Sequence, residues 1–306
     1  MKEIIESLSK KYKKLNSLLN LSAKLSGNEF NSLLLELFKI QNGKISPSDL
    51  VRHYTENRFV IPSTVNVLAF KALELEWLSF ADKNAFTPII LSPLTPLGTC
   101  SVVAEVHQNN VVSASRRAEV VTDVTNVLAL KIANDFKATQ NKDIVKYATA
   151  HRHVRGQSFT NTGFTAHFGV FCLVSGGLDT GDYNFEMGQL LEHIAVHLSL
   201  LMEKFDPKNL SLKLHIRENN PKFVQLLEHK LTEKQLTYEL IEDYEKGDYY
   251  CLIQFKINLK YKDMDINVAD GGLVDWTQKL IPNKKHRLFI SGCGIELVHK
   301  MLDGQF

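Results

Sequence analysis

The first sixty residues carry apolar side chains at the three- and four-residue intervals typical of amphipathic helices. The first such run is Ile4, Ile5, Leu8, Tyr12, Leu15, Leu18 and Leu19. A second run covers 30–40, and Ser46 before Pro47 favours a third helix start, because serine caps and proline suits a first turn. We therefore predict a helical extension over 1–60, packed on the rest of the chain. Its four lysines between positions 10 and 14 indicate a solvated face.

The remaining chain, 61–306, alternates between helical and strand-like patterns and is predicted to form one α+β core domain. Helices are predicted over 63–81, 184–205, 221–231 and 295–302, and strands over 211–217, 249–259 and 289–292. An extended segment is expected over 86–93. Weak alternation over 102–115 predicts a hairpin that turns at Asn109-Asn110.

Composition changes this picture little. The chain has 306 residues, of which 44% are hydrophobic and 23% charged, with a net charge of +2. These values suit a soluble protein and give no strong field for a polyanion, although a local basic patch needs no net excess. No apolar run has the length needed to span a bilayer, and the N-terminus is unlike a signal peptide. The four scattered cysteines favour a reducing compartment, so a cytoplasmic protein is expected.

Three short motifs follow one another in the last third of the chain. They read Asp248-Tyr249-Tyr250 before the apolar run 251–257, then Gly271-Gly272-Leu273-Val274-Asp275, then Gly292-Cys293-Gly294-Ile295-Glu296. Their order and spacing resemble the end of the catalytic domain of histidyl-type class II aminoacyl-tRNA synthetases, whose motifs are R-G-L-D-Y-Y-x-x-x-x-F, G-G-R-Y-D and G-x-G-x-E-R. The resemblance covers roughly residues 65–302.

This resemblance implies a class II synthetase-like mixed sheet, mostly antiparallel and flanked by helices, behind the helical extension. It covers no anticodon-binding domain, so tRNA is not an expected partner. The helix 63–81 and the strand after it stand where the first class II motif builds a dimer interface. Trp77 and Leu78 lie on an apolar face too rich for a solvent-exposed helix, and a homodimer is therefore expected.

Asp123 and Thr125 stand where the family has the Glu and Thr that hold the amino group of the amino acid. A carboxylate and a hydroxyl can satisfy an ammonium group, and on an extended segment both would point to one side. The alternative is a helix cap, in which Asp123 or Thr125 receives first-turn N–H groups.

The second class II motif is only partly present. Gly156, Phe159 and Phe168 fit the family pattern, but Thr160 replaces the phosphate-binding arginine and Thr162 the nearby glutamate. The later glutamine is Val170. Upstream, Arg152 and Arg155 lie on a basic strand. That strand either borders the site or is an ordinary exposed strand.

Further cations of the family are also replaced. Glu245 stands for an arginine that helps amino-acid activation, Leu297 for the ATP-stacking arginine, and Leu273-Val274 for Arg-Tyr. Leucine and threonine cannot replace the charge-assisted bonds of arginine to phosphate. The candidate ligand-binding residues that remain are Asp123, Thr125, Arg155, His167, Tyr249, Tyr250, Gly271, Gly272 and Glu296. Strand alternation is expected to turn only one of the two tyrosines toward the cleft.

Two other site types have weaker support in the sequence. His193 and His197 are one helical turn apart, which allows a metal pair, but both flank the apolar stripe of 184–205 and also suit boundary positions of a packed helix. No G-x-x-x-x-G-K-[ST] or G-x-G-x-x-G motif is present, so a P-loop or Rossmann nucleotide site has no support.

Three functions are compatible with these patterns. The first is a catalytically degenerate paralog that binds a small amino-acid-like ligand in a regulatory or accessory role, with a possible protein partner. The regulatory subunit of ATP phosphoribosyltransferase is the family's precedent. The second is an amino-acid-activating ligase with rearranged ATP contacts, the only one of the three that implies a cofactor, ATP with magnesium. The third is a dimeric scaffold subunit.

Overall fold

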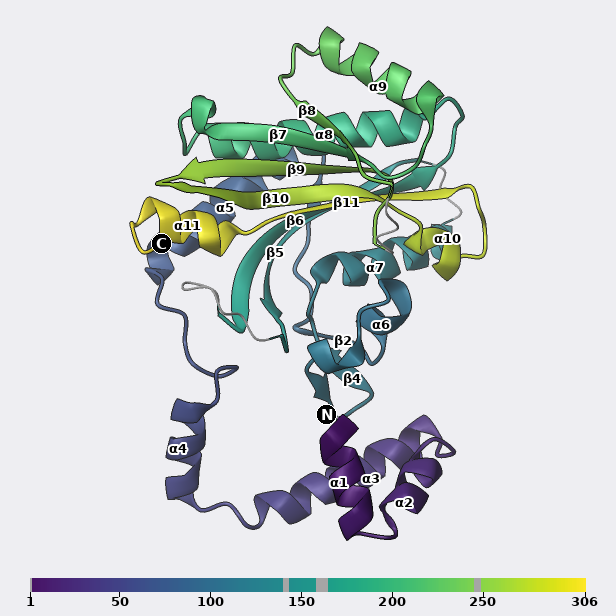
Figure 1. Ribbon diagram of the computed structural model, residues 1–306, viewed down its shortest axis with the longest axis vertical. Helices are drawn as coiled ribbons and strands as arrows, with labels where there is room; N and C mark the ends of the chain where they lie inside the picture. Colours follow the sequence, from purple (N-terminus) through teal and green to yellow (C-terminus); the bar gives the residue numbers. More distant parts are fainter. Residues whose placement is uncertain (1, 140–142, 158–164, 245–248) are drawn as a thin grey trace.

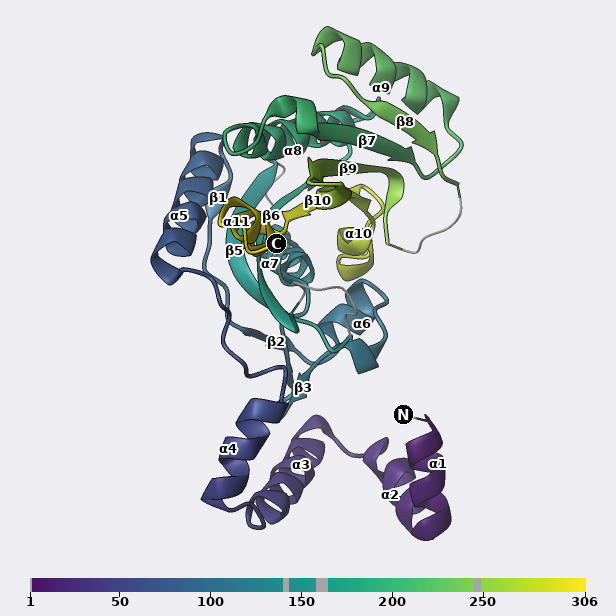
Figure 2. The same ribbon diagram turned by 60° about the vertical axis from the view of Figure 1, so that its left-hand side comes forward.

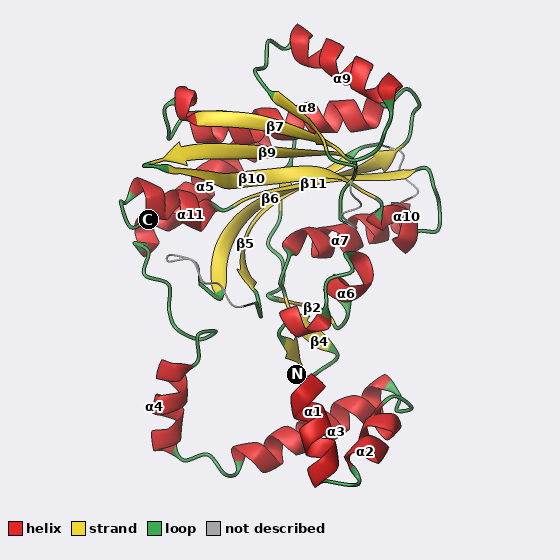
Figure 3. Ribbon diagram, in the orientation of Figure 1, coloured by secondary structure: helices red, strands yellow, loops and turns green. Residues whose placement is uncertain are grey.

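A mixed sheet of eight strands forms the centre of the fold (Figures 1 and 3). The computed structural model describes residues 2–139, 143–157, 165–244 and 249–306. The strand order is β1-β5-β6-β11-β10-β9-β7-β8, and only the outer pairs β1/β5 and β7/β8 are parallel. The predicted mostly antiparallel sheet flanked by helices is confirmed.

The element bounds are as follows. The central strands are β1 Thr87–Pro88, β5 Val145–Val154, β6 His167–Leu178, β7 Leu210–Ile216, β8 Glu239–Glu242, β9 Cys251–Tyr261, β10 Met264–Val274 and β11 His286–Cys293, and a small second sheet contains β2 Leu94–Pro96, β3 Ser113–Ala114 and β4 Ala118–Val120. The helices are α1 Lys2–Lys11, α2 Leu15–Ser22, α3 Gly27–Asn42, α4 Pro47–Glu56, α5 Val67–Lys83, α6 Thr99–Val103, α7 Val124–Thr139, α8 Asn184–Met202, α9 Pro221–Glu233, α10 Trp276–Leu280 and α11 Ile295–Leu302.

Helices cover both faces of the central sheet. Alternation along β11 sends Phe289 to the face packed by α5 and α8, and Ile290 to the face packed by α7 and α10. Figure 2 shows α5 and α8 on one side of the sheet and α7 and α10 on the other. The predicted helices at α8, α9 and α11 are confirmed, since their apolar stripes pack on this sheet.

Helix α5 begins four residues later than predicted, because the Asn66 side chain accepts hydrogen bonds from the backbone N–H groups of Leu68 and Ala69. Trp77 lies on an apolar face of α5, as expected, but this residue is not available to a dimer interface. Trp77 is fully buried, with its ring edge-on to Phe171 of β6 at 5.4 Å between centroids. The apolar character of α5 at Trp77 is therefore explained by packing within the chain.

The predicted hairpin at Asn109-Asn110 was also wrong. These asparagines lie in a 3-10 turn, and the N–H of Asn109 is bonded to the His107 ring. The observed hairpin joins β3 and β4 and turns at Arg116 and Arg117, both with positive φ. Sequence patterns locate such turns poorly here, because each paired strand has only two or three residues.

Helices α1–α4, which we call the arm, lie beyond the small sheet at the end of the molecule opposite α9 (Figure 1). The segment is helical, as predicted, and α2, α3 and α4 contribute no buried residue. The arm contacts the small sheet where the Asn31 side chain of α3 accepts the backbone N–H of Arg116. Beside the core, Arg58 donates hydrogen bonds to the carbonyl groups of Gly156 and Gln157 at 2.6 and 2.8 Å. Within the described ranges, no helix combines the length and apolar character needed to cross a membrane.

Candidate functional site

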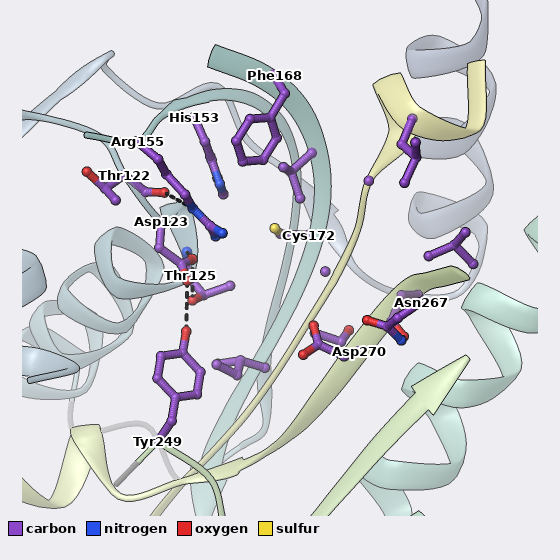
Figure 4. Close-up of a pocket in the computed structure, with 18 of the residues that line it drawn as sticks. Thr122, Asp123, Thr125, His153, Arg155, Phe168, Cys172, Tyr249, Asn267 and Asp270 are labelled. Atoms are coloured by element: carbon purple, nitrogen blue, oxygen red, sulfur yellow. Dashed lines mark hydrogen bonds between the residues drawn. The ribbon is translucent and has the colours of Figure 1, made fainter. Parts of the chain in front are cut away.

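A cavity of about 670 Å³ lies on the α7 side of the sheet. Its walls come from the N-terminus of α7, the end of β5 and strands β6, β11, β10 and β9, with α11 at the rim. The volume is within the range of small-molecule sites in proteins. Figure 4 shows polar side chains on two opposite walls with Cys172 of β6 between them.

Asp123 holds the entry to α7 and also lines the cavity. Its Oδ1 accepts hydrogen bonds from the backbone N–H and the hydroxyl of Thr125, at 3.0 and 2.7 Å, while its Oδ2 accepts the hydroxyl of Tyr249 at 2.7 Å (Figure 4). The prediction that Asp123 and Thr125 lie on an extended segment was wrong, because Thr125 is already the second residue of α7. Asp123 therefore caps α7 and also lines the cavity, while its contact with a ligand amino group stays a prediction.

The surroundings of Asp123 favour its charged form. Burial alone would raise its pKa, but the charge of nearby Arg155, together with the hydrogen bonds from Thr125 and Tyr249, holds the pKa below its usual range. Burial and the Asp123 charge in turn raise the pKa of Tyr249 well above its ordinary value. The pair at neutral pH is thus a carboxylate and a neutral phenol.

His153 and Arg155 form the wall next to Asp123. The Nε2 atom of His153 accepts the N–H of Val124 at 3.1 Å, which places the ring proton on Nδ1. Burial lowers the pKa of His153 to about 3, so the ring is neutral. The guanidinium of Arg155 lies 5.3 Å from the Phe168 ring centroid. Of the two interpretations of the basic strand, the structure therefore places Arg155 at the cavity.

Both tyrosines line the cavity, whereas only one was expected there. Tyr249 and Tyr250 precede β9, so strand alternation does not apply to them, and their rings meet edge-on at 4.8 Å. The start of β9 is irregular. Leu252 has φ 52°, and the pairing register of β9 with β10 shifts between Gly272 and Leu273. β9 therefore begins with an irregularity of the β-bulge type next to the two tyrosines.

Gly271 and Gly272 lie beside the site and not in its lining. A Cβ atom on Gly271 would come within 2.4 Å of the Ser291 Cβ, and one on Gly272 within 2.7 Å of the Tyr250 ring. Their role in this structure is close packing, because Gly272 lets the Tyr250 ring rest against β10. The glycine pair therefore supports the cavity wall from behind.

Glu296 borders the cavity, but protein donors surround its carboxylate. It accepts hydrogen bonds from the hydroxyl of Ser63 (2.6 Å), the N–H of Gly169 (2.8 Å) and Arg152 (2.8 Å). Burial would raise its pKa, but these donors and Arg152 hold it below the ordinary value. His167 lies outside the lining, where its Nδ1 accepts from Arg152 at 2.8 Å and its Nε2 donates to the Ile61 carbonyl at 2.6 Å.

His193 and His197 are not boundary residues, because both are fully buried between α8 and the sheet. His193 bonds to Ser175 and Ser291, and His197 to Ser291, each at 2.8 Å. Burial lowers the pKa of both rings. No group of three or more candidate metal ligands occurs in the described ranges. Thr160, Thr162 and Glu245 lie outside those ranges.

Several cavity residues were missed by the sequence reasoning, and Asp270 is the only acidic one among them in the described lining. Asp270 of β10 projects into the cavity from the wall opposite Asp123 (Figure 4). Burial and the Asp123 charge raise its pKa to about 6, although Lys256 and Arg155 oppose this shift. The available signal was an aspartate inside an apolar strand, a position where aspartate is depleted.

Taken together, the described lining can bind charged groups at separate points. Asp123 and Asp270 offer carboxylate oxygens to donors, and Arg155 offers a guanidinium to an anion. Val170, Cys172 and Ile290 supply an apolar floor between them. This arrangement suits a small zwitterionic ligand.

Known structures share the architecture. Apo histidyl-tRNA synthetase of S. aureus superposes with a TM-score of 0.60 at 12% identity, covering 80% of this chain and 69% of that one. A histidine–tRNA ligase subunit of Alicyclobacillus acidocaldarius gives 0.62 at 10% identity, covering 80% and 96%. An ATP phosphoribosyltransferase regulatory subunit/histidyl-tRNA synthetase of Bacillus halodurans gives 0.60 at 12% identity, covering 80% and 83%.

No family model matches the sequence, and no curated protein does so either. At these identities the superpositions establish the fold, which is that of a class II aminoacyl-tRNA synthetase-like catalytic domain. The resemblance inferred from the three C-terminal motifs is confirmed at the level of the fold.

The raised pKa of Asp270 predicts a pH-dependent effect on stability. The carboxyl is protonated in both folded and unfolded chains well below pH 3.8 and ionised in both well above pH 6. The destabilisation of the folded state by the ionised carboxylate therefore develops between these two pH values. A rise from 3.8 to about 6 corresponds to roughly 3 kcal/mol, at about 1.4 kcal/mol per pKa unit. Asp270→Asn should therefore raise the free energy of unfolding by roughly 2–3 kcal/mol at pH 8 but by less than about 1 kcal/mol at pH 4.

Urea unfolding at both pH values measures this difference, with Asp263→Asn in the exposed β9–β10 turn as the matched control. An Asp270→Asn variant that is no more stable than wild type at pH 8 would show that the Asp270 carboxylate is already compensated.

Proposed function

We propose that this chain is a catalytically degenerate relative of the histidyl-type synthetase catalytic domain, and that its cavity binds a small amino-acid-like ligand in a regulatory or accessory role. The observation that carries the proposal is the ionised Asp123 carboxylate at the cavity, held by Thr125 and Tyr249. One protein with this fold is named as an ATP phosphoribosyltransferase regulatory subunit/histidyl-tRNA synthetase, so a regulatory role stands beside a synthetase role in the name of a protein of this architecture.

The charges of the cavity favour an amino acid over a neutral ligand. A ligand ammonium group needs a carboxylate and further acceptors, and Asp123 with the Thr125 hydroxyl oxygen supplies both. Arg155 lies on the neighbouring wall and offers the donors that a ligand carboxylate requires. Both anchors are positioned by secondary structure, Asp123 by α7 and Arg155 by the end of β5.

The expected loss of catalysis rests on the replaced arginines. Leu297 lines the cavity where the family places the arginine that stacks on ATP, and an aliphatic side chain provides no charge there. Without arginines of this kind, the negative charge of a pentavalent phosphorus transition state lacks its main stabilisation.

We therefore expect no ATP-dependent pyrophosphate exchange with any of the twenty standard amino acids. The assay uses the purified full chain with ATP, magnesium and labelled pyrophosphate, and an active histidyl-tRNA synthetase serves as the positive control. Robust exchange with one amino acid would contradict catalytic degeneracy.

That contrary result would favour the ligase alternative, which one observation supports. Four basic side chains, Arg155, Arg217, Lys256 and Lys300, line the same cavity. Three of them have partners within the protein: Arg217 pairs with Asp243 at 2.6 Å, Lys300 pairs with Glu296 at 3.5 Å, and Arg155 donates to the Thr122 carbonyl at 3.5 Å. A ligase would have to redirect such groups to phosphate.

Ligand binding depends on Asp123 in this proposal. A thermal-shift screen of the standard amino acids identifies the tightest binder, and calorimetry then compares wild type with Asp123→Asn. The Asn variant should lose about 1.5–3 kcal/mol of binding free energy, the usual contribution of a hydrogen bond to a charged group. Its stability should change little, because asparagine also caps helices.

Asp135→Asn is the matched control, since Asp135 lies on the same helix and bonds to Lys131 and Tyr147 away from the cavity lining. Equal affinities of wild type and Asp123→Asn would leave Asp123 with only its capping role.

We also propose a homodimer built on α5 and the segment after β1. With Trp77 buried, the support comes from apolar side chains that remain exposed there, namely Leu68 (80%), Leu75 (67%) and Ile90 (98%). Exposed apolar side chains of this kind favour association.

Light scattering at micromolar concentration should report a dimer, and replacing Leu68 and Leu75 together by glutamate should produce a folded monomer. Met264→Glu, at an exposed apolar position in the β9–β10 region, should leave the dimer intact. A monomeric wild type would refute this interface and the scaffold function that depends on it.

A further inference from the structure

Resting on the proposed function, we infer that the ligand is a basic α-amino acid, with a second nitrogen cation on its side chain as in lysine or ornithine, and that Asp270 binds this second cation. The inference deepens the assignment of the same cavity. It follows from the comparison of two carboxylates in the cavity, Asp123 and Asp270, which differ sharply in the hydrogen bonds that they accept.

The position of Asp270 is fixed by the sheet. In the sheet, Asp270 lies opposite Lys256 of the neighbouring strand β9 and opposite Gly292 of the neighbouring strand β11. Its side chain enters the cavity from the wall opposite Asp123 (Figure 4). A ligand whose ammonium group lies at Asp123 therefore extends its other end toward Asp270.

Asp270 has weaker partners than the other cavity carboxylates. The hydroxyl of Tyr250 and the amide of Gln254 approach its Oδ2 only to 3.5 and 3.4 Å. Asp123 and Glu296, in contrast, accept bonds of 2.6–3.0 Å. Within the described ranges Asp270 makes no ion pair at or below 4.0 Å, so its charge is available to a ligand.

The charges around Asp270 agree with this role. Burial and the negative charge of Asp123 raise its pKa to about 6, while Lys256 and Arg155 oppose the shift without removing it. The second cation of the ligand would reverse this effect at Asp270, because a nearby positive charge stabilises the ionised carboxylate. A ligand with one ammonium group and an aliphatic tail would instead place methyl groups beside Asp270, which is unfavourable for the carboxylate.

The cavity has room for such a ligand. Its volume of about 670 Å³ exceeds what a single amino acid occupies, and its floor of Val170, Cys172 and Ile290 can contact the methylene groups of a lysine or ornithine chain. The long aliphatic stem and terminal cation of these amino acids therefore match the apolar floor and the distant carboxylate.

Lysine and norleucine provide the test, because they differ mainly in the terminal ammonium group. Calorimetry at pH 7.5 with the full chain should show lysine binding at least about tenfold more tightly than norleucine, since a charge-assisted bond is gained. Asp270→Asn should weaken the binding of lysine and bring the affinities for lysine and norleucine together. Asp263→Asn should preserve the preference for lysine. At pH 5, where Asp270 of the free protein is largely protonated, the preference should shrink.

The outcomes separate this inference from the proposal on which it rests. Equal affinities for lysine and norleucine in wild type, both lowered by Asp123→Asn, would retain the amino-acid site and refute the role of Asp270. A lysine preference that survives Asp270→Asn would also refute it. If neither amino acid binds at millimolar concentration, both this inference and the binding part of the proposed function fail.

Discussion

One carboxylate connects parts of the chain that are far apart in sequence. Asp123 accepts hydrogen bonds from Thr125 in the first turn of α7. It also accepts one from the hydroxyl of Tyr249, which lies 126 positions later in the sequence. Burying a charged group is tolerated only when hydrogen bonds compensate for lost hydration. The start of α7, the approach to β9 and the shape of the cavity are therefore tied to one another through the oxygens of Asp123.

The large elements of the fold were predictable from sequence. The stripes of α8, α9 and α11 are long or regular enough to specify helices, and the C-terminal motifs identified the sheet architecture through resemblance. The smaller elements were not predictable, because β3 and β4 have two and three residues, too few for a periodic signal. The start of α5 depends on the Asn66 cap, which the apolar pattern does not show.

The candidate site was predictable where a motif residue carries its own chemistry, as with Asp123 and Tyr249. Gly272 and His167 also lie in motif regions, but Gly272 packs against the Tyr250 ring and His167 bonds to Arg152 and the Ile61 carbonyl, and a motif does not distinguish these roles. Asp270 was missed for the opposite reason. It matches no motif, and its importance depends on which wall of the cavity β10 forms.

The backbone at Leu252 limits how the site can change. A leucine in the left-handed region costs roughly 1–3 kcal/mol in strain, and its buried side chain helps to offset that cost. Glycine would relax the backbone but leave a gap in the core, and valine or isoleucine would fill the gap with a greater steric penalty. Few substitutions at Leu252 would leave both the backbone and the core undisturbed, so the geometry beside the two tyrosines constrains this position although Leu252 does not line the cavity.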